Sequence, residues 1–202
     1  MLASASFIER NARTTVVEAL SEARAVCLLG ARQVGKSTLA RAIAGREHPA
    51  RYMTLDDEAT RRAAREDATG FIARVSGPTV IDEVQRAPDL MLAIKERLDT
   101  DNRRGQFLLA GSANILTLPT IADALPGRID YVRLWPFSQG ELAGRRESFI
   151  DRLLAGKPPH IDNAPIGRGA YAAQIVAGGF PDAHSRGTRG RARFFESGLW
   201  LT

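Results

Sequence analysis

Cysteine, lysine and long apolar runs are scarce in this sequence. Its 202 residues include one cysteine, so no internal disulfide can form, and the apolar run around Cys27 predicts a buried strand thiol. No apolar run approaches the roughly 18 residues that span a bilayer. The first residues also lack the basic region and apolar core of a secretory signal. We therefore expect a cytoplasmic protein that does not cross a membrane.

Lysine is rare beside arginine: of the 28 basic residues, only Lys36, Lys95 and Lys157 are lysines. A lysine at a motif position is therefore more informative than usual. The net charge of +5 suits nucleic-acid contact and phosphate handling equally, so nucleic-acid binding stays open. The three histidines have no ligand spacing with Cys27 or with one another, so we expect no structural metal.

Short apolar runs alternate with helical patterns over the first 135 residues. Strands are expected at residues 25–29, 51–55, 79–81, 106–110 and 131–134. Helices are expected at residues 14–23, 37–44, 88–99 and 120–125, and a charged helix follows Asp56 and Asp57, which cap it or line a site. This alternation predicts a three-layer α/β domain with a central parallel sheet.

The character of the sequence changes after Trp135. Residues 138–141 have the capping-box spacing that begins a helix. Residues 156–169 indicate a loop or linker, and a short helix is expected at 171–177 before Gly178. Four arginines between residues 186 and 193 favour a solvated helix face, with nucleic-acid backbone contact as the alternative.

A glycine-rich segment follows the first strand and opens the next helix. It satisfies the G-x-x-x-x-G-K-[ST] pattern with Gly30, Ala31, Arg32, Gln33, Val34, Gly35, Lys36 and Ser37. The glycines allow a tight turn whose N–H groups point at phosphate oxygens, and the helix N-terminus adds partial positive charge. Lys36 is expected to reach the β- and γ-phosphates and Ser37 to ligate Mg²⁺. The pattern predicts a nucleoside triphosphate site, with ATP and Mg²⁺ as the expected ligands.

Two acids end the third expected strand. Asp82 would hold the hydration shell of Mg²⁺, and Glu83 is placed to orient or deprotonate an attacking water. The alternative is a pair of solvated loop acids. Because they follow the phosphate loop with one strand candidate between, we favour the functional interpretation.

Polar residues follow the fourth strand, and an arginine precedes the fifth. Ser112 or Asn114 is placed to touch the γ-phosphate or the attacking water, although both residue types also suit turns. Arg128 is a candidate for stabilising transition-state charge, in the same subunit or across an interface, with a surface arginine as the alternative.

Taken together, these stretches resemble the AAA+-like ATPases of bacteria and archaea usually called ATP-binding proteins, in which a P-loop AAA domain precedes a poorly characterised C-terminal domain. The matching stretches occur in the family's order. They are residues 29–38, 52–57, 81–85, 109–112, 125–128, 134–138 with Glu141, and 178–181.

The resemblance implies the strand order 5-1-4-3-2. It also implies a Walker A segment at residues 30–37 followed by Thr38, Walker B at Asp82 with Glu83 as catalytic base, a sensor at Ser112, and an arginine finger at Arg128. Family members are longer, so we expect residues 1–137 to form the ATPase domain and 138–202 an incomplete start of the C-terminal region. A homo-oligomer, a missing domain or a partner protein is expected to complete the molecule.

The leading functional hypothesis is an ATPase domain whose hydrolysis drives an attached or partner domain. A non-hydrolysing nucleotide-dependent interaction module, a small-molecule phosphotransferase and a nucleic-acid-stimulated ATPase remain alternatives. The adjacent pair Asp82 and Glu83 favours hydrolysis over transfer to a small molecule.

Overall fold

A computed structural model describes residues 7–112, 127–158 and 166–198 of the chain. The chain forms two compact units, Ala12–Trp135 and Met1–Asn11 with Pro136–Thr202. Asn114 and the helix expected at residues 120–125 lie outside the described residues. Within the described ranges, no helix is long and apolar enough to cross a membrane.

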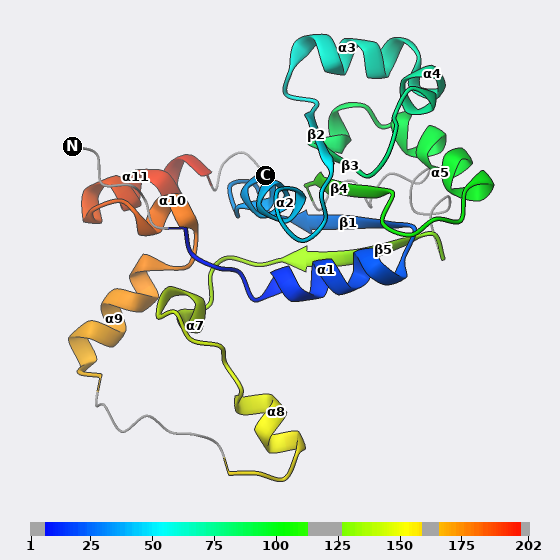
Figure 1. Cartoon of the computed structure of the whole chain (residues 1–202). Helices are drawn as coiled ribbons and strands as arrows, with labels where there is room; N and C mark the ends of the chain where they lie inside the picture. The colour runs from blue at the N-terminus through cyan, green and yellow to red at the C-terminus, as the bar shows by residue number, and fades with distance from the viewer. Residues whose placement is uncertain (1–6, 113–126, 159–165, 199–202) are drawn as a thin grey trace. The chain divides into compact units, whose positions relative to one another are not determined.

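Five parallel strands form the centre of the first unit (Figure 1). They are β1 Ala25–Gly30, β2 Arg51–Thr54, β3 Thr79–Asp82, β4 Phe107–Gly111 and β5 Ile129–Leu134. The sheet order β2-β3-β4-β1-β5 confirms the α/β class and the order 5-1-4-3-2 that the resemblance implied. Because parallel strands all end at one edge, the segments that follow their carboxyl ends come together, which is where open α/β sheets bind ligands.

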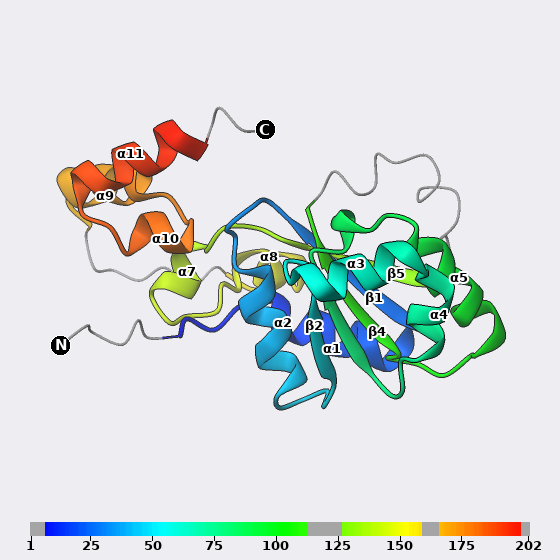
Figure 2. The same ribbon diagram turned by 90° about the horizontal axis from the view of Figure 1, so that it is seen from above.

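Helices cover both faces of this sheet (Figure 2). They are α1 Ala12–Glu22, α2 Lys36–Ala44, α3 Glu58–Glu66, α4 Ala68–Ala73 and α5 Leu90–Thr100. Side chains of β1 alternate between faces: Val26 and Leu28 pack in the core with α1 and α2, and Cys27 and Leu29 pack in the core with α4 and α5. Cys27 is a free, fully buried thiol as predicted, and burial raises its pKa to about 12.

Of the two aspartates predicted to cap the helix after β2, one does so. Asp57 caps α3 by accepting the N–H of Thr60 at 2.8 Å, whereas Asp56 forms an ion pair with Arg86 at 2.7 Å. The sequence did not predict α4, which begins at Ala68 with Asp67, the residue after α3, as its N-cap. Its six residues include a glycine and are too few to display a helical period.

The described part of the second unit is helical. Its helices are α7 Gln139–Leu142, α8 Phe149–Leu154, α9 Arg168–Ala177, α10 Pro181–His184 and α11 Thr188–Gly198. The capping box that begins α7 is formed, since Ser138 and Glu141 bond reciprocally to each other's backbone N–H. Glu141 also accepts from Arg10 at 3.2 Å and from the N–H of Asn11 at 2.7 Å, so this carboxylate joins the chain's first described residues to α7.

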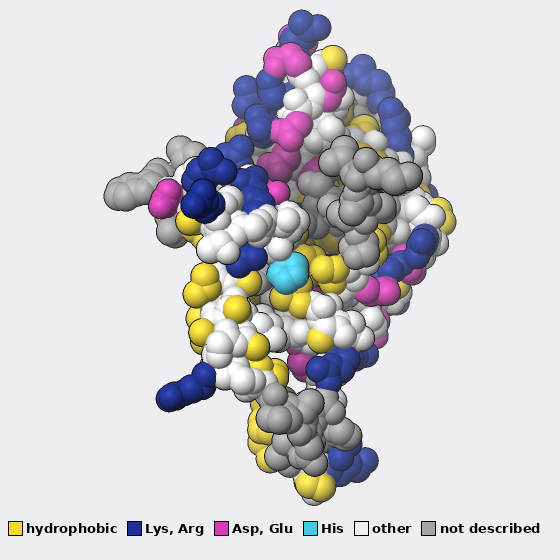
Figure 3. Space-filling model, turned by 90° about the vertical axis from the view of Figure 1, so that its left-hand side faces the viewer, with side chains coloured by type: hydrophobic (Ala, Val, Ile, Leu, Met, Phe, Trp, Pro, Cys, Tyr) yellow, Lys and Arg dark blue, Asp and Glu magenta, His cyan; other side chains and the backbone are white. Residues whose placement is uncertain are grey.

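The second unit exposes many apolar side chains in α8 and α9. Figure 3 shows hydrophobic side chains on the face of the molecule that it presents. The exposed large ones in these two helices are Phe149, Ile150, Leu153, Leu154, Tyr171, Ile175 and Val176. Of the predicted solvated arginines, Arg186, Arg189 and Arg193 are exposed, whereas Arg191 is half-buried and donates to the carbonyl of Ala183 at 3.1 Å.

Candidate functional site

The segment predicted to bind phosphate forms a tight loop between β1 and α2. Gly35, which precedes α2, has a φ of 100°, a left-handed conformation that glycine adopts without steric cost. Gly30 is required for a different reason: a Cβ there would lie 2.5 Å from the carbonyl oxygen of Leu134 on the neighbouring strand β5. Val34 is fully buried and anchors the loop in the core. The loop is therefore held by its neighbours in a compact turn.

Backbone strain in the described residues is confined to this site. In the described residues, the non-glycine residues with positive φ are Gln33 at 63° and Glu83 at 58°. Such conformations cost ~1–3 kcal/mol each and persist where the surrounding structure imposes them, often at functional sites. One of the two belongs to the phosphate loop and the other to the acid pair after β3.

Lys36 is a buried cation inside the loop, with 6% of the residue exposed. Its Nζ donates to the carbonyl oxygens of Gly30 at 3.0 Å and Ala31 at 2.9 Å. Desolvation lowers its pKa, and the negative charges of Glu83 and Asp82 oppose that shift. The ammonium therefore lies within electrostatic reach of both acids. Ala31, Arg32, Gln33 and Thr38 are exposed, and Ser37 is half-buried directly after Lys36 in α2.

Asp82 ends β3 as a buried carboxylate, 2% exposed. Its Oδ2 accepts from the Tyr52 hydroxyl at 2.5 Å, and its Oδ1 accepts from the N–H of Glu83 at 3.0 Å. Burial and the bond to Asp82 raise the pKa of Tyr52 to about 12, so the hydroxyl stays a donor at neutral pH. The guanidinium of Arg41, from α2, lies 4.4 Å from the centre of the Tyr52 ring. Both oxygens of Asp82 are thus fixed in orientation.

Glu83 precedes a short 3₁₀ turn, η1 Val84–Arg86, which folds Gln85 back toward it. Gln85 Nε2 donates to Glu83 Oε2 in a short hydrogen bond. The other end of the same amide, Oε1, accepts the N–H of Ser112 at 3.3 Å. Ser112 follows β4, which lies between β1 and β3 in the sheet. Ser112 therefore lies at the same edge as the phosphate loop and the two acids.

Arg128 lies at the opposite edge of the sheet. It precedes β5, whose first residue pairs with Ala25, whereas Gly30 pairs with the last residue of β5. Five residues at ~3.3 Å each separate the two edges by about 16 Å along the strands. The side chain forms an ion pair with Asp99 of α5, and this bond lowers the pKa of Asp99. The structure does not bring Arg128 to the phosphate loop of its own chain.

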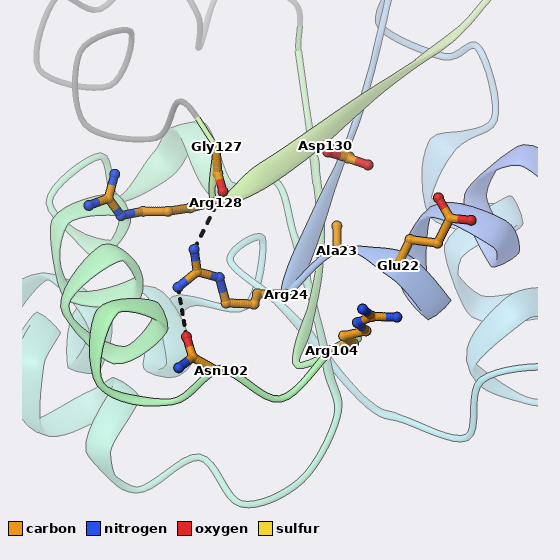
Figure 4. Close-up of a pocket in the computed structure, with 8 residues that line it drawn as sticks. All are labelled: Glu22, Ala23, Arg24, Asn102, Arg104, Gly127, Arg128 and Asp130. Carbon is orange, nitrogen blue, oxygen red and sulfur yellow. Dashed lines mark hydrogen bonds between the residues drawn. The ribbon is translucent and has the colours of Figure 1, made fainter.

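A polar pocket of about 380 Å³ lies at the edge of the sheet that carries Arg128 (Figure 4). Its lining includes three arginines, Arg24, Arg104 and Arg128. Arg24 donates to Asn102 Oδ1 at 3.2 Å and to the carbonyl of Gly127 at 3.4 Å, so it connects β1 to the start of β5. The sequence did not predict this pocket.

Two residues at the site, Tyr52 and Gln85, were missed by the sequence analysis. Tyr52 reaches Asp82 because it pairs with Val80 of β3, two residues before Asp82, a register that neither periodicity nor the implied strand order gives. Gln85 lies in a stretch that carried the resemblance, but nothing in the spacing shows that a 3₁₀ turn brings it to Glu83.

Comparison with known proteins places this site in a family. The sequence model described as AAA domain matches residues 22–143, more than half of the chain. Uncharacterized proteins of Mycobacterium tuberculosis and Mycobacterium bovis are each 35% identical over 156 residues, which cover 74% of this chain and 33% of theirs. The chain thus spans about a third of the length of these curated relatives.

Solved structures share the fold at low identity. A Walker-type ATPase of Pyrococcus abyssi is 18% identical, with a TM-score of 0.54 over 96% of this chain and 73% of its own. AMPPCP-bound DnaA from Aquifex aeolicus is 16% identical, with a TM-score of 0.52 over 95% of this chain and 67% of its own. These similarities support the fold alone.

Proposed function

The chain belongs to the AAA domain family, and from that premise we propose that it hydrolyses ATP in a magnesium-dependent reaction. The family makes it a P-loop ATPase domain of the AAA type, which binds nucleotide. The choice of ATP, the use of magnesium and the hydrolytic step are the proposal.

The observation that carries the proposal is the convergence of a buried ammonium and two carboxylates at one edge of the sheet. Lys36 and Asp82 are 6% and 2% exposed, and the charges of Asp82 and Glu83 both act on the pKa of Lys36. Phosphoryl transfer to water needs a cation for phosphate, a ligand for the metal and a base for water. The three side chains supply one group for each need.

Lys36 exchanges partners when phosphate binds. In the structure its ammonium donates to two neutral carbonyl oxygens of the loop. Phosphate oxygens carry full negative charge, and charge-assisted hydrogen bonds are about twice as strong as neutral ones. The β- and γ-phosphates would therefore draw Lys36 away from Gly30 and Ala31, while the N–H groups of residues 30–38 close around them.

The residues at this edge fit a magnesium ion held mainly by its nucleotide. Mg²⁺ takes one or two protein oxygens and fills its remaining positions with phosphate oxygens and water. The Ser37 hydroxyl follows Lys36 directly, and Asp82 offers an oriented carboxylate whose partners in the described residues are neutral donors. Ser37 and Asp82 would hold the ion, which would neutralise the negative charge that develops during hydrolysis.

Glu83 takes the proton of the attacking water in this proposal. We test it by measuring phosphate release and ATP binding for the wild type and for Glu83→Gln. The variant keeps the shape of the side chain but loses its basicity, so turnover should fall at least ~100-fold. ATP affinity should stay within about threefold of the wild type, and chelating magnesium should abolish wild-type turnover.

The matched control is Glu18→Gln, which changes an exposed glutamate on α1 and should leave turnover unchanged. Binding without any turnover by the wild type would refute hydrolysis and favour a nucleotide-dependent interaction module. Loss of the γ-phosphate only when a small-molecule acceptor is present would favour a phosphotransferase.

Hydrolysis is proposed to drive a domain outside this chain. The support is the length of the relatives: this chain corresponds to about a third of each mycobacterial relative, so the ATPase domain occupies a minor part of such proteins.

We also propose a cytoplasmic location. It fits the buried free thiol of Cys27, since disulfides are rare in that compartment.

Arg128 is proposed to act on the nucleotide of a second copy of the chain. Its distance from its own phosphate loop, about 16 Å along the strands, argues against action in the same subunit. The Arg128 side chain is 30% exposed and pairs with Asp99, so it would have to leave Asp99 to reach a neighbouring molecule. A guanidinium supplied in this way stabilises transition-state charge in trans. The proposal requires a homo-oligomer.

A further inference from the structure

Gln85 is the one described side chain that hydrogen-bonds to both Glu83 and the segment after β4. Its amide donates to Glu83 Oε2 and accepts from the N–H of Ser112. Only one orientation of the amide satisfies both bonds, because a flipped amide would set oxygen against a carboxylate and NH₂ against an N–H. These two partners therefore determine the orientation of the Gln85 amide, with Nε2 toward Glu83 and Oε1 toward Ser112. We call this pair of hydrogen bonds the linkage.

The bond from Gln85 uses only one of the two carboxylate oxygens of Glu83. Gln85 occupies Oε2, and in the part of the chain that the structure describes Oε1 has no hydrogen-bond partner. An amide is neutral, so it holds the carboxylate in place without pairing the negative charge as an arginine or lysine would. One oxygen is thus anchored and the other stays free to accept a proton.

The linkage also connects two neighbouring strand ends. Asp82 of β3 pairs with Ala110 of β4, so Glu83 and Ser112 leave the sheet side by side. A ligand that moves the backbone at Ser112 would move the acceptor end of Gln85 and, through its amide, the carboxylate of Glu83. The orientation of the acid therefore depends on the position of the residue after β4.

We propose that Gln85 is a positioning residue that holds Glu83 toward the attacking water and couples it to the end of β4. The inference rests on the proposed hydrolysis. An untethered glutamate samples several rotamers, and a displacement of about 1 Å from the productive geometry costs on the order of 100-fold in rate. The role concerns turnover and not nucleotide binding.

The test compares turnover with nucleotide affinity in Gln85→Ala and Gln85→Glu. Both variants should lower kcat by about 10- to 100-fold while the Kd for ATP changes by less than about threefold. Gln85→Glu keeps the size of the side chain but replaces the donor with a second carboxylate, so it carries the test if Gln85→Ala folds poorly. Arg86→Ala, on the same 3₁₀ turn, is the matched control and should retain kcat.

A second arm separates positioning from a general disturbance. In a Glu83→Gln background, Gln85→Ala should have no further effect on turnover, because the group that it positions is gone. A further loss equal to that in the wild type would overturn the inference, as would a rise in Kd equal to the fall in kcat.

The outcomes also distinguish this inference from the proposed function. Normal turnover by Gln85→Ala, with turnover abolished in Glu83→Gln, would overturn the role of Gln85 and leave hydrolysis intact. Absence of turnover in the wild type would overturn both.

Discussion

At Lys36, burial and the nearby carboxylates act on the ammonium in opposite directions. Desolvation lowers its pKa, whereas Glu83 and Asp82 raise it, and two loop carbonyls solvate the charge in place of water. A buried charge without such partners would be strongly destabilising. The two backbone carbonyl oxygens of the loop therefore hold the ammonium in place, and phosphate oxygens could replace them as its partners.

At Asp82, a tyrosine fixes the orientation of the carboxylate. Tyr52→Phe removes the hydroxyl that donates to Oδ2 and leaves the ring beneath Arg41 in place. Loss of such an outer partner typically costs 10- to 100-fold in metal affinity or activity. We expect the magnesium concentration for half-maximal turnover to rise about tenfold, with little change in metal-free nucleotide binding.

The measurement is a magnesium titration of ATP turnover at saturating nucleotide. Tyr171→Phe, which alters an exposed tyrosine of α9, is the control. An unchanged magnesium requirement in Tyr52→Phe would show that the hydroxyl does not orient a metal ligand.

At the scale of elements, the sequence predicted the strands more completely than the helices. All five expected strands are present in the structure. The fully buried β1, β3 and β4 are short runs rich in apolar residues, whereas the edge strands β2 and β5 are partly exposed. The sheet order came from the resemblance to a family, because alternation of strands and helices does not determine which strands are neighbours. The helices α4, α8 and α10 were not predicted, since they have only six, six and four residues and no helical period can be read from so few.

The candidate site was predictable where one local segment supplies the chemistry. The phosphate loop and the acids after β3 are contiguous motifs, and the structure brings Lys36, Asp82 and Glu83 to one edge. Tyr52 and Gln85 were not predictable: the contact of Tyr52 depends on the register of β2 against β3, which the implied strand order does not give, and that of Gln85 depends on a 3₁₀ turn. The arginine at position 128 was found by its place in the chain, but only the register of β5 shows which edge it occupies.

In the whole molecule, we expect each active site to be shared between two copies of the chain. Arg128→Ala and Glu83→Gln should each lose most turnover alone, because each lacks one half of the proposed shared site. A mixture of the two should recover part of the activity, since a copy with Glu83 can meet a copy with Arg128. Turnover of mixed and separate proteins, at several concentrations, measures this.

Arg104→Ala, which removes another arginine of the same pocket, is the matched control and should retain turnover. Whether Arg128→Ala is folded is checked by its thermal unfolding, because its ion pair with Asp99 is only 30% and 37% exposed. Full activity of Arg128→Ala alone, or a mixture no more active than its parts, would contradict action across subunits.

Binding of the ATP phosphates by residues 30–38 and the ammonium of Lys36 can be measured by calorimetry. ATP and Mg²⁺ are titrated into the wild type, into Lys36→Ala and into the control Lys95→Ala. The wild type and Lys95→Ala should bind alike, and Lys36→Ala should bind at least ~100-fold more weakly, because it loses charge-assisted bonds to two phosphates. Tight binding of ATP by Lys36→Ala would contradict the account.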